Sequence, residues 1–141
     1  ARPFLITKDY AEHYCNQKGG TLYVPRTQPK RGEYQQLYQT LGLSFGEAGI
    51  HLGLTQKGFT IDKGVKVPVL ADNLGLEVPF WIRKYSRELF QRSRREDYLV
   101  NVILRGAKMF LVQRRESAYG VCVSLPKGSG LKNSHILIEY F

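Results

Sequence analysis

Side chains that could perform acid–base, nucleophilic or metal chemistry are few and widely spaced in this 141-residue chain. The three histidines are His13, His51 and His135, and the two cysteines are Cys15 and Cys122. Catalysis requires a nucleophile beside a base, a pair of carboxylates or a metal-binding cluster, and the sequence has none of these spacings. We therefore expect the histidines to be structural, and we predict no catalytic residue, no metal site and no cofactor.

Two shorter patterns also argue against an enzyme. Glu96-Asp97 directly follows Arg94-Arg95, an order that favours ion pairs at the surface. The glycine-rich segment 128–130 lacks the Gly-Lys-Ser/Thr sequence of a phosphate-binding loop. We predict that the protein is not an enzyme.

The positive charge is concentrated in one part of the chain. The whole chain has 21 Lys and Arg against 12 Asp and Glu, a net charge of +9, and residues 83–115 contain ten of the basic residues but only three acidic ones. Eight of these ten are arginine, whose planar guanidinium suits carboxylate, phosphate or sulfate groups. The segment indicates a surface for an anionic partner, although charge runs also occur on faces that contact only solvent.

The partner classes that this charge suits are an acidic glycan, a nucleic acid, a lipid headgroup and an acidic patch on a protein. Arginine and aromatic residues commonly anchor interfaces, and they are interleaved here. The residues that we expect to bind such a partner are Arg83, Tyr85, Arg87, Arg92, Arg94 and Arg95.

The two cysteines allow two interpretations. Cys15 falls on the apolar stripe of a predicted helix, and Cys122 falls in a late apolar segment. A disulfide between them would close a very long loop, which constrains the unfolded chain. Two separate buried thiols are equally compatible with the spacing.

Hydrophobic periodicity predicts two helices early in the chain. The first should run from a cap at Thr7 to about Lys18, where Gly19-Gly20 ends it. The second should run over about 32–41, and both have apolar residues along one stripe. Short strands are expected at 4–6, 21–24, 50–54, 99–104, 107–112, 119–125 and 135–141.

Residues 55–97 follow no single pattern. Residues 63–70 alternate Val with other residues but include Pro68, which indicates an edge strand or an extended loop. Residues 79–82 should be buried, with Trp81 as a core anchor, and Asp72-Asn73 suggests a turn. Residues 85–97 could form a basic helix or an irregular segment. Helices early and strands late predict an α+β fold with a long loop excursion.

Length and composition predict one domain over residues 1–141. A hydrophobic content of 43% excludes an intrinsically disordered chain, and no apolar run approaches the roughly 20 residues of a membrane helix. The first six residues lack the apolar stretch of a signal peptide. We expect either a cytosolic protein or a processed piece of a larger secreted one.

The order of these features resembles a C-type lectin-like domain, and among its branches the C-terminal adhesion domain of the bacterial intimin/invasin family. That family has a first helix bearing a Cys, a Gly-Gly turn, a strand ending in Pro, a second helix, a Trp-Ile-Gly-Leu-like strand and a late strand bearing a Cys. The segments that carry the resemblance are residues 11–15, 19–22, 24–25, 33–41, 51–54 and 119–123.

The resemblance implies a disulfide between Cys15 and Cys122 and an oxidising compartment. It further implies an extracellular adhesion domain, exposed at the distal part of an outer-membrane-anchored bacterial protein of which this chain is a terminal fragment. Such a virulence-associated domain would bind a host receptor protein or an anionic glycan without inserting into the membrane. The chain departs from the family by continuing past Cys122 and by its unmatched residues 55–97.

The usual calcium-dependent sugar site of C-type lectins is not expected. That site uses a Glu-Pro-Asn or Gln-Pro-Asp tripeptide and a Trp-Asn-Asp triplet, and neither is present. Residues 77–79 contain Glu and Pro in the wrong order. The competing hypotheses are a basic intracellular nucleic-acid-binding domain, although no known nucleic-acid-binding motif is visible, and an assembly domain at the tip of a pilus or phage fibre.

Overall fold

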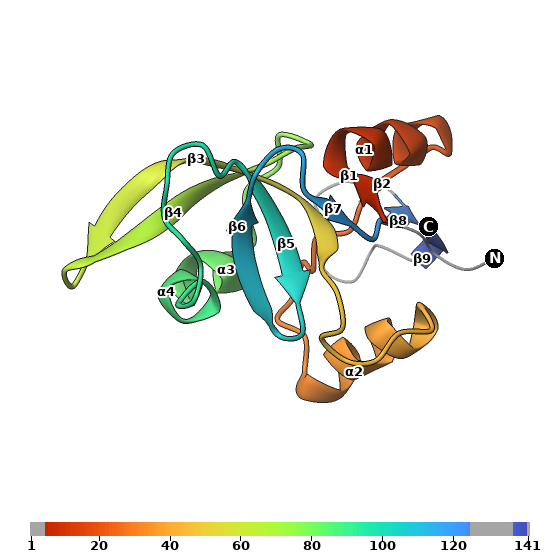
Figure 1. Cartoon of the computed structure of the whole chain (residues 1–141), viewed down its shortest axis with the longest axis horizontal. Helices are drawn as coiled ribbons and strands as arrows, with labels where there is room; N and C mark the ends of the chain where they lie inside the picture. The colour runs from red at the N-terminus through yellow and green to blue at the C-terminus, as the bar shows by residue number, and fades with distance from the viewer. Residues whose placement is uncertain (1–4, 125–136, 141) are drawn as a thin grey trace.

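The computed structural model describes residues 5–124 and 137–140, which adopt an α+β fold with mostly antiparallel strands. Residues 125–136 lie outside the described residues, and with them the predicted glycine-rich segment, His135 and the start of the predicted last strand. A four-stranded sheet forms the centre, in the order β4 (Val65–Asp72), β3 (Ile50–Asp62), β5 (Asn101–Arg105) and β6 (Lys108–Val112). A three-stranded sheet of β2 (Gly20–Leu22), β8 (Val121–Ser124) and β9 (Leu137–Tyr140) lies at the end that holds helix α1 (Lys8–Gln17) (Figure 1).

The chain begins with strand β1, Ile6–Thr7, and helix α1, Lys8–Gln17. Thr7 occupies the cap position as predicted, and the helix ends before Gly19, whose φ of +79° suits glycine. Strand β2, Gly20–Leu22, follows directly. The sequence placed this helix correctly to within one residue at its C-terminal end.

Helix α2 spans Arg31–Thr40, close to the predicted range. The side chain of Glu33 accepts a hydrogen bond from the backbone N–H of Lys30 at 2.7 Å, which satisfies one free donor at the helix start. The helix ends at Thr40. Gly42 follows with a φ of +74°, and the N–H groups of Gly42 and Leu43 donate to the carbonyls of Gln39 and Tyr38. This paired closure is the usual one for a glycine after the last turn.

The prediction of a long loop excursion over residues 55–97 is wrong for residues 55–72, because these residues continue the sheet. Strand β3 runs over Ile50–Asp62 and strand β4 over Val65–Asp72. The two-residue turn at Lys63 and Gly64 has φ values of 51° and 79°, the positive pair that a tight hairpin requires. Pro68 lies in β4, which is an edge strand, as one of the two predicted alternatives stated.

Two short helices follow: α3, Phe80–Lys84, and α4, Ser86–Leu89. Trp81 and Ile82 are buried as expected, and the indole of Trp81 donates to the carbonyl of Pro25 at 2.9 Å. Phe80, also predicted to be buried, is 66% exposed. The helical turn separates it from its two buried neighbours, because successive helical side chains point about 100° apart.

The late strands are β5, Asn101–Arg105; β6, Lys108–Val112; β7, Ser117–Ala118; β8, Val121–Ser124; and β9, Leu137–Tyr140. The β5–β6 hairpin turns at Gly106, whose φ is +65°. Strand β7 pairs with β1, and β8 pairs with β2, so the two ends of the chain meet.

A disulfide between Cys15 and Cys122 joins α1 to β8, with the two Cα atoms 5.3 Å apart. Both cysteines are fully buried in a small cluster with Ala11 and Leu22. The structure thus decides between the two interpretations that the spacing left open. The main core lies between the central sheet and helices α2, α3 and α4. No helix in the described residues is long and apolar enough to cross a membrane.

Candidate binding face

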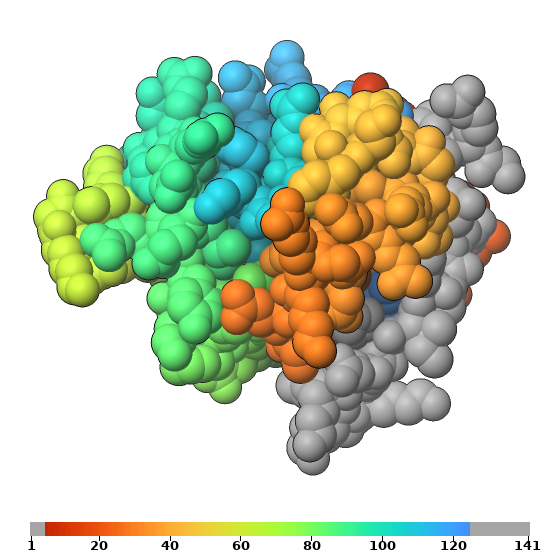
Figure 2. Space-filling view, turned by 90° about the horizontal axis from the view of Figure 1, so that it is seen from below, coloured from red at the N-terminus to blue at the C-terminus, as the bar shows by residue number. Residues whose placement is uncertain are grey.

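The β3–β4 hairpin and helices α3 and α4 form one side of the molecule, which we call the hairpin face and define as residues 55–95. The hairpin projects beyond the rest of the fold, with α3 and α4 beside it (Figure 1). Seen from below, its tip stands clear of the molecule (Figure 2). Ile61, at the far end, is 67% exposed.

The basic residues of the hairpin face come from two segments, the β3–β4 hairpin and residues 83–95, and nothing in the sequence indicated that these two lie side by side. Residues 55–95 contain nine Lys and Arg but four acidic residues. Lys57, Lys63 and Lys66 come from the hairpin, and the other six come from residues 83–95. Tertiary structure therefore extends the predicted basic segment onto the hairpin.

Two of the predicted binding arginines form close ion pairs with carboxylates. Arg83 contacts Glu77 at 2.9 Å, and Arg94 contacts both carboxylate oxygens of Glu96 at 3.0 and 3.1 Å. Hydrogen bonds from the Tyr98 hydroxyl and from Arg94 lower the pKa of Glu96, which keeps this exposed pair charged. The predicted ion pairing between residues 94–95 and 96–97 is thus present for Arg94.

Arg95 supports the local backbone. Its guanidinium donates to the carbonyls of Phe90 at 2.6 Å and Ser93 at 3.2 Å. The hydroxyl of Ser93 accepts a hydrogen bond from the backbone N–H of Leu111, which attaches this turn to β6. The Nε atom of Arg95 is one of several buried side-chain nitrogen and oxygen atoms in the described residues that have no hydrogen-bond partner.

The remaining predicted residues differ in their availability. Tyr85 is half-buried and packs on the main core, with the amine of Lys84 5.3 Å from its ring centre. Arg87 lies 3.9 Å from Asp62 at the hairpin tip, a long ion pair. Arg92 is exposed, and no described residue forms an ion pair or hydrogen bond with it. Arg87 and Arg92 are therefore the predicted arginines most available to a partner.

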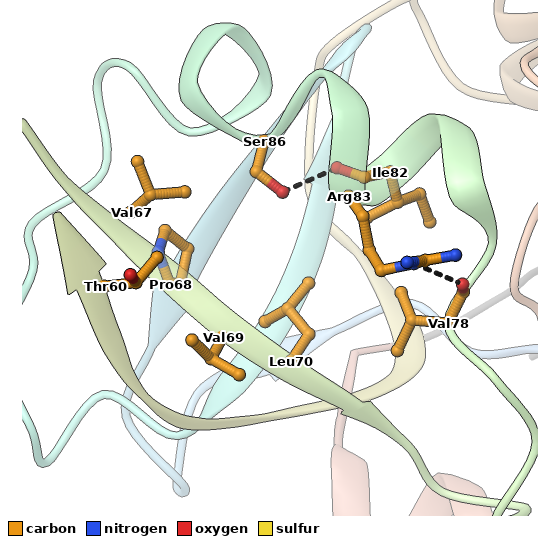
Figure 3. Close-up of a pocket in the computed structure, with 9 residues that line it drawn as sticks. All are labelled: Thr60, Val67, Pro68, Val69, Leu70, Val78, Ile82, Arg83 and Ser86. Carbon is orange, nitrogen blue, oxygen red and sulfur yellow. Dashed lines mark hydrogen bonds between the residues drawn. The ribbon is translucent and has the colours of Figure 1, made fainter. Parts of the chain in front are cut away.

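An apolar hollow of about 220 Å³ lies between strand β4 and helix α3 (Figure 3). Val67–Leu70 form one wall, Val78 and Ile82 form the other, and Thr60 reaches in from β3. Arg83 lies at its rim, where Nε donates to the carbonyl of Val78 at 3.2 Å. The alternating valines of β4 were visible in the sequence, but the helix that faces them was not.

A second hollow, of about 390 Å³, lies further along the same strand. Val65 of β4 lines it, together with Arg87, Glu88, Gln91 and Arg95. Both hollows have β4 on one side, and their opposite walls contain the consecutive residues Ser86 and Arg87. We call these two neighbouring hollows together the trough, with an apolar end at Val67–Leu70 and a basic end at Arg87 and Arg95.

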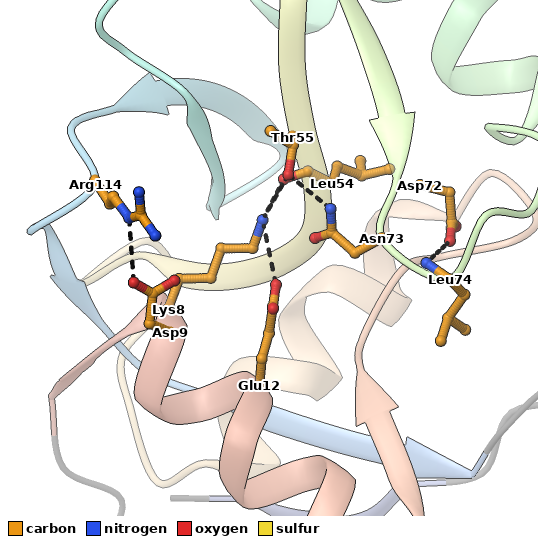
Figure 4. Close-up of polar contacts among 9 residues, drawn as sticks. All are labelled: Lys8, Asp9, Glu12, Leu54, Thr55, Asp72, Asn73, Leu74 and Arg114. Atoms are coloured by element: carbon orange, nitrogen blue, oxygen red, sulfur yellow. Dashed lines mark hydrogen bonds and ion pairs between the residues drawn. The ribbon is translucent and has the colours of Figure 1, made fainter.

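Another polar cavity, of about 440 Å³, lies beside α1 and centres on a lysine that the sequence did not single out. The amine of Lys8, only 2% exposed, donates to the Leu54 carbonyl at 2.6 Å and the Thr55 hydroxyl at 3.3 Å, and lies 3.5 Å from Glu12 (Figure 4). Burial lowers the pKa of Lys8, and Glu12 opposes that shift. This network attaches α1 to the central strand β3.

The lining charges of this cavity are already matched within the protein. Arg114 contacts Asp9 at 3.2 Å, and Asn73 donates to the Thr55 hydroxyl at 2.6 Å (Figure 4). Residues 72–74 form the predicted turn, in which Asp72 accepts a hydrogen bond from the N–H of Leu74 at 2.7 Å. The contacts of this cavity join α1 to the sheet, so we assign it a structural role.

Asp72 also forms a buried ion pair with Arg26, at 2.7 Å, in which both side chains are almost inaccessible to solvent. It connects the loop after β2 to the end of β4. Two residues 46 positions apart gave no sequence signal for this contact.

The described histidines occupy separate places. His13 is exposed on α1, and His51 is fully buried in β3, where Nε2 contacts the carbonyl of Ile6 at 2.7 Å. Burial lowers the pKa of His51. Within residues 5–124 and 137–140, no three His, Cys, Asp or Glu side chains gather as a metal site would require.

Comparison with known proteins provides no further assignment. No protein-family model, no curated protein sequence and no solved structure matches the chain.

Proposed function

We propose that this chain is an extracellular adhesion domain with a C-type lectin-like fold, similar to the C-terminal domain of the intimin/invasin adhesins, and that its hairpin face binds an acidic partner. The observation that carries the proposal is the disulfide between the first helix and a late strand.

The disulfide also supports the expected location. Structural disulfides persist in oxidising surroundings such as the bacterial cell surface and the exterior of host cells. Both cysteines are buried in an apolar cluster, where the bond is protected from exchange. This favours a domain that works outside the cell.

The hairpin face supports a binding role. Ile61, Val69 and Phe80 are large apolar side chains that it exposes, and they lie among its excess of basic residues. Exposed apolar groups beside arginines are typical of surfaces that contact other macromolecules. The partner is a host receptor protein or an anionic glycan.

The test is binding of the folded domain to host cells and to sulfated or sialylated glycans. Charge reversal of Arg87 and Arg92 should weaken binding, and increasing salt should weaken it further. Arg115→Glu is the matched control for Arg87→Glu and for Arg92→Glu made singly, because it changes the net charge equally at an exposed residue outside the hairpin face. The basic-face proposal would be refuted if neither increasing salt nor charge reversal at Arg87 and Arg92 changed the binding affinity.

The two alternatives predict different results in the same assay. A nucleic-acid-binding domain should bind DNA or RNA with an affinity that falls steeply with salt. A tip-assembly domain should bind its own fibre proteins and not host cells. Mass measurement before and after reduction adds a check, since free thiols in the purified protein would favour the intracellular alternative.

A further inference from the structure

We propose that the trough between β4 and helices α3–α4 binds an extended peptide segment of a protein partner, with an apolar side chain in one hollow and a carboxylate at Arg87 in the other. This inference rests on the proposed binding function and specifies its ligand. It favours a protein partner over a glycan.

The apolar end of the trough selects a hydrophobic side chain. Val67, Val78 and Ile82 line it and are each at least nine-tenths buried, so a side chain that enters is surrounded by hydrocarbon. Transferring an aliphatic or aromatic side chain from water into such a hollow is favourable. Glycan hydroxyls would lose hydrogen bonds to water there and find few partners.

The basic end selects a carboxylate. Among the described residues, Arg87 forms an ion pair only with Asp62, at 3.9 Å, and the buried Nε of Arg95 has no hydrogen-bond partner there. A ligand carboxylate can replace Asp62 at Arg87 and accept two hydrogen bonds from its guanidinium. The surplus of basic over acidic residues in the hairpin face attracts such a segment.

The spacing of the two hollows sets the pattern of the ligand. Val65 lines the basic hollow and Val69 the apolar one, and four residues of extended chain span about 13 Å. Side chains of an extended peptide point to the same side at even separations only. The acidic and apolar residues of the ligand should therefore be two or four positions apart, and not three.

The edge of β4 permits limited backbone pairing with the ligand. The tight turn makes Asp62 and Val65 a hydrogen-bonded pair, so the backbone groups of Lys66 and Pro68 face away from β3. Lys66 offers a donor and an acceptor, whereas Pro68 offers only an acceptor. Side chains therefore provide most of the selectivity.

The experiment measures binding of short synthetic peptides to the intact domain by fluorescence anisotropy. Peptides with an acidic and a bulky apolar residue two or four positions apart should bind at least about tenfold more tightly than the same composition at a separation of three. Equal binding at both separations would overturn the proposal, as would the absence of saturable binding.

Two variants test the two hollows separately. Thr60→Trp fills the apolar hollow from an exposed position on β3 and should abolish the preference for an apolar residue. Arg87→Glu should weaken binding of the acidic peptide at least about tenfold, and a lysine in place of the peptide's acidic residue should restore it. Arg115→Glu should leave the affinity within about twofold, because it lies outside the trough.

The same variants separate failure of this inference from failure of the proposed function. If the domain binds host cells or sulfated glycans but shows no saturable, spacing-dependent binding of the peptides, the peptide trough is wrong and the adhesion proposal stands. If the domain binds neither cells nor glycans while peptides bind with the expected spacing, the trough stands and the adhesion proposal is wrong.

Discussion

The two ends of this molecule differ in whether their charged side chains form buried contacts within the protein or remain exposed to solvent. At the stapled end, which comprises α1, β2 and β8, the Cys15–Cys122 disulfide and the buried Lys8 amine attach the first helix to the sheets. At the hairpin face, most charged groups remain in contact with solvent. The difference separates a region whose polar contacts maintain the fold from one that presents them to a partner.

The comparison predicts that the largest loss of stability comes from removing the disulfide. Cys15→Ala with Cys122→Ser should lower the free energy of unfolding by roughly 2–5 kcal/mol, because the bond closes a loop of 107 positions in the unfolded chain. Denaturant unfolding measures the change. If the reduced and oxidised proteins unfold at the same denaturant concentration, the disulfide does not stabilise this end.

Breaking the buried Arg26–Asp72 pair should cause a loss of stability of similar size. Arg26→Met leaves a buried carboxylate without its cation and should cost about 3–5 kcal/mol. The double variant Arg26→Met with Asp72→Leu should recover part of that loss, because it removes both buried charges. Equal destabilisation by the single and double variants would mean that the charge is unimportant.

A smaller effect should come from pH through His51. Burial lowers the pKa of His51 in the folded protein below its unfolded value near 6.5, so the unfolded state binds the proton first as the pH falls. Stability should therefore decrease below pH 6.5, by at most about 1.4 kcal/mol per pH unit, until the folded pKa is passed. Above pH 6.5 this group contributes no pH dependence.

Comparison of two histidine variants isolates that contribution. His51→Gln should reduce the slope of unfolding free energy against pH between about 5 and 6.5, whereas His13→Gln, at an exposed position, should not. The slope is compared and not the absolute stability, since Gln at a buried site has its own cost. Identical slopes for both variants would exclude His51 as the titrating group.

The smallest effect belongs to the hairpin face. Arg94→Gln removes a pair with Glu96 in which both side chains contact solvent, so the free energy of unfolding should not change beyond experimental error. A clear loss of stability would show that this surface pair also maintains the fold, and would weaken the contrast between the two ends.

Local patterns predicted the early half of the fold well. The helices near 8–17 and 31–40 follow from their apolar stripes and from the glycines at 19 and 42. The late hairpin was also predicted, with its first strand two residues too long at the start. The hairpin at 50–72 was predicted only in part: a strand at 50–54 and an edge strand or loop at 63–70 were expected, but Pro68 weakened the strand pattern and the turn at Lys63 and Gly64 was not recognised.

The candidate site was predicted only in part, and its binding role is still a prediction. The sequence identified the arginine-rich segment, but carboxylates neutralise Arg83 and Arg94, and Arg95 supports a turn. The apolar hollow needs β4 and α3 side by side, although Val67 and Ile82 are 15 positions apart. No local pattern records such a contact.

By itself, the sequence determined the α+β class, the early helices, the absence of the usual calcium-site motifs and the concentration of positive charge, because composition and short-range periodicity encode them. Only the tertiary structure decided that the two cysteines bond, which arginines remain unpaired, and that the hairpin meets α3 and α4 to form a trough. Those features depend on which distant segments become neighbours, and long-range packing settles that for the whole chain at once.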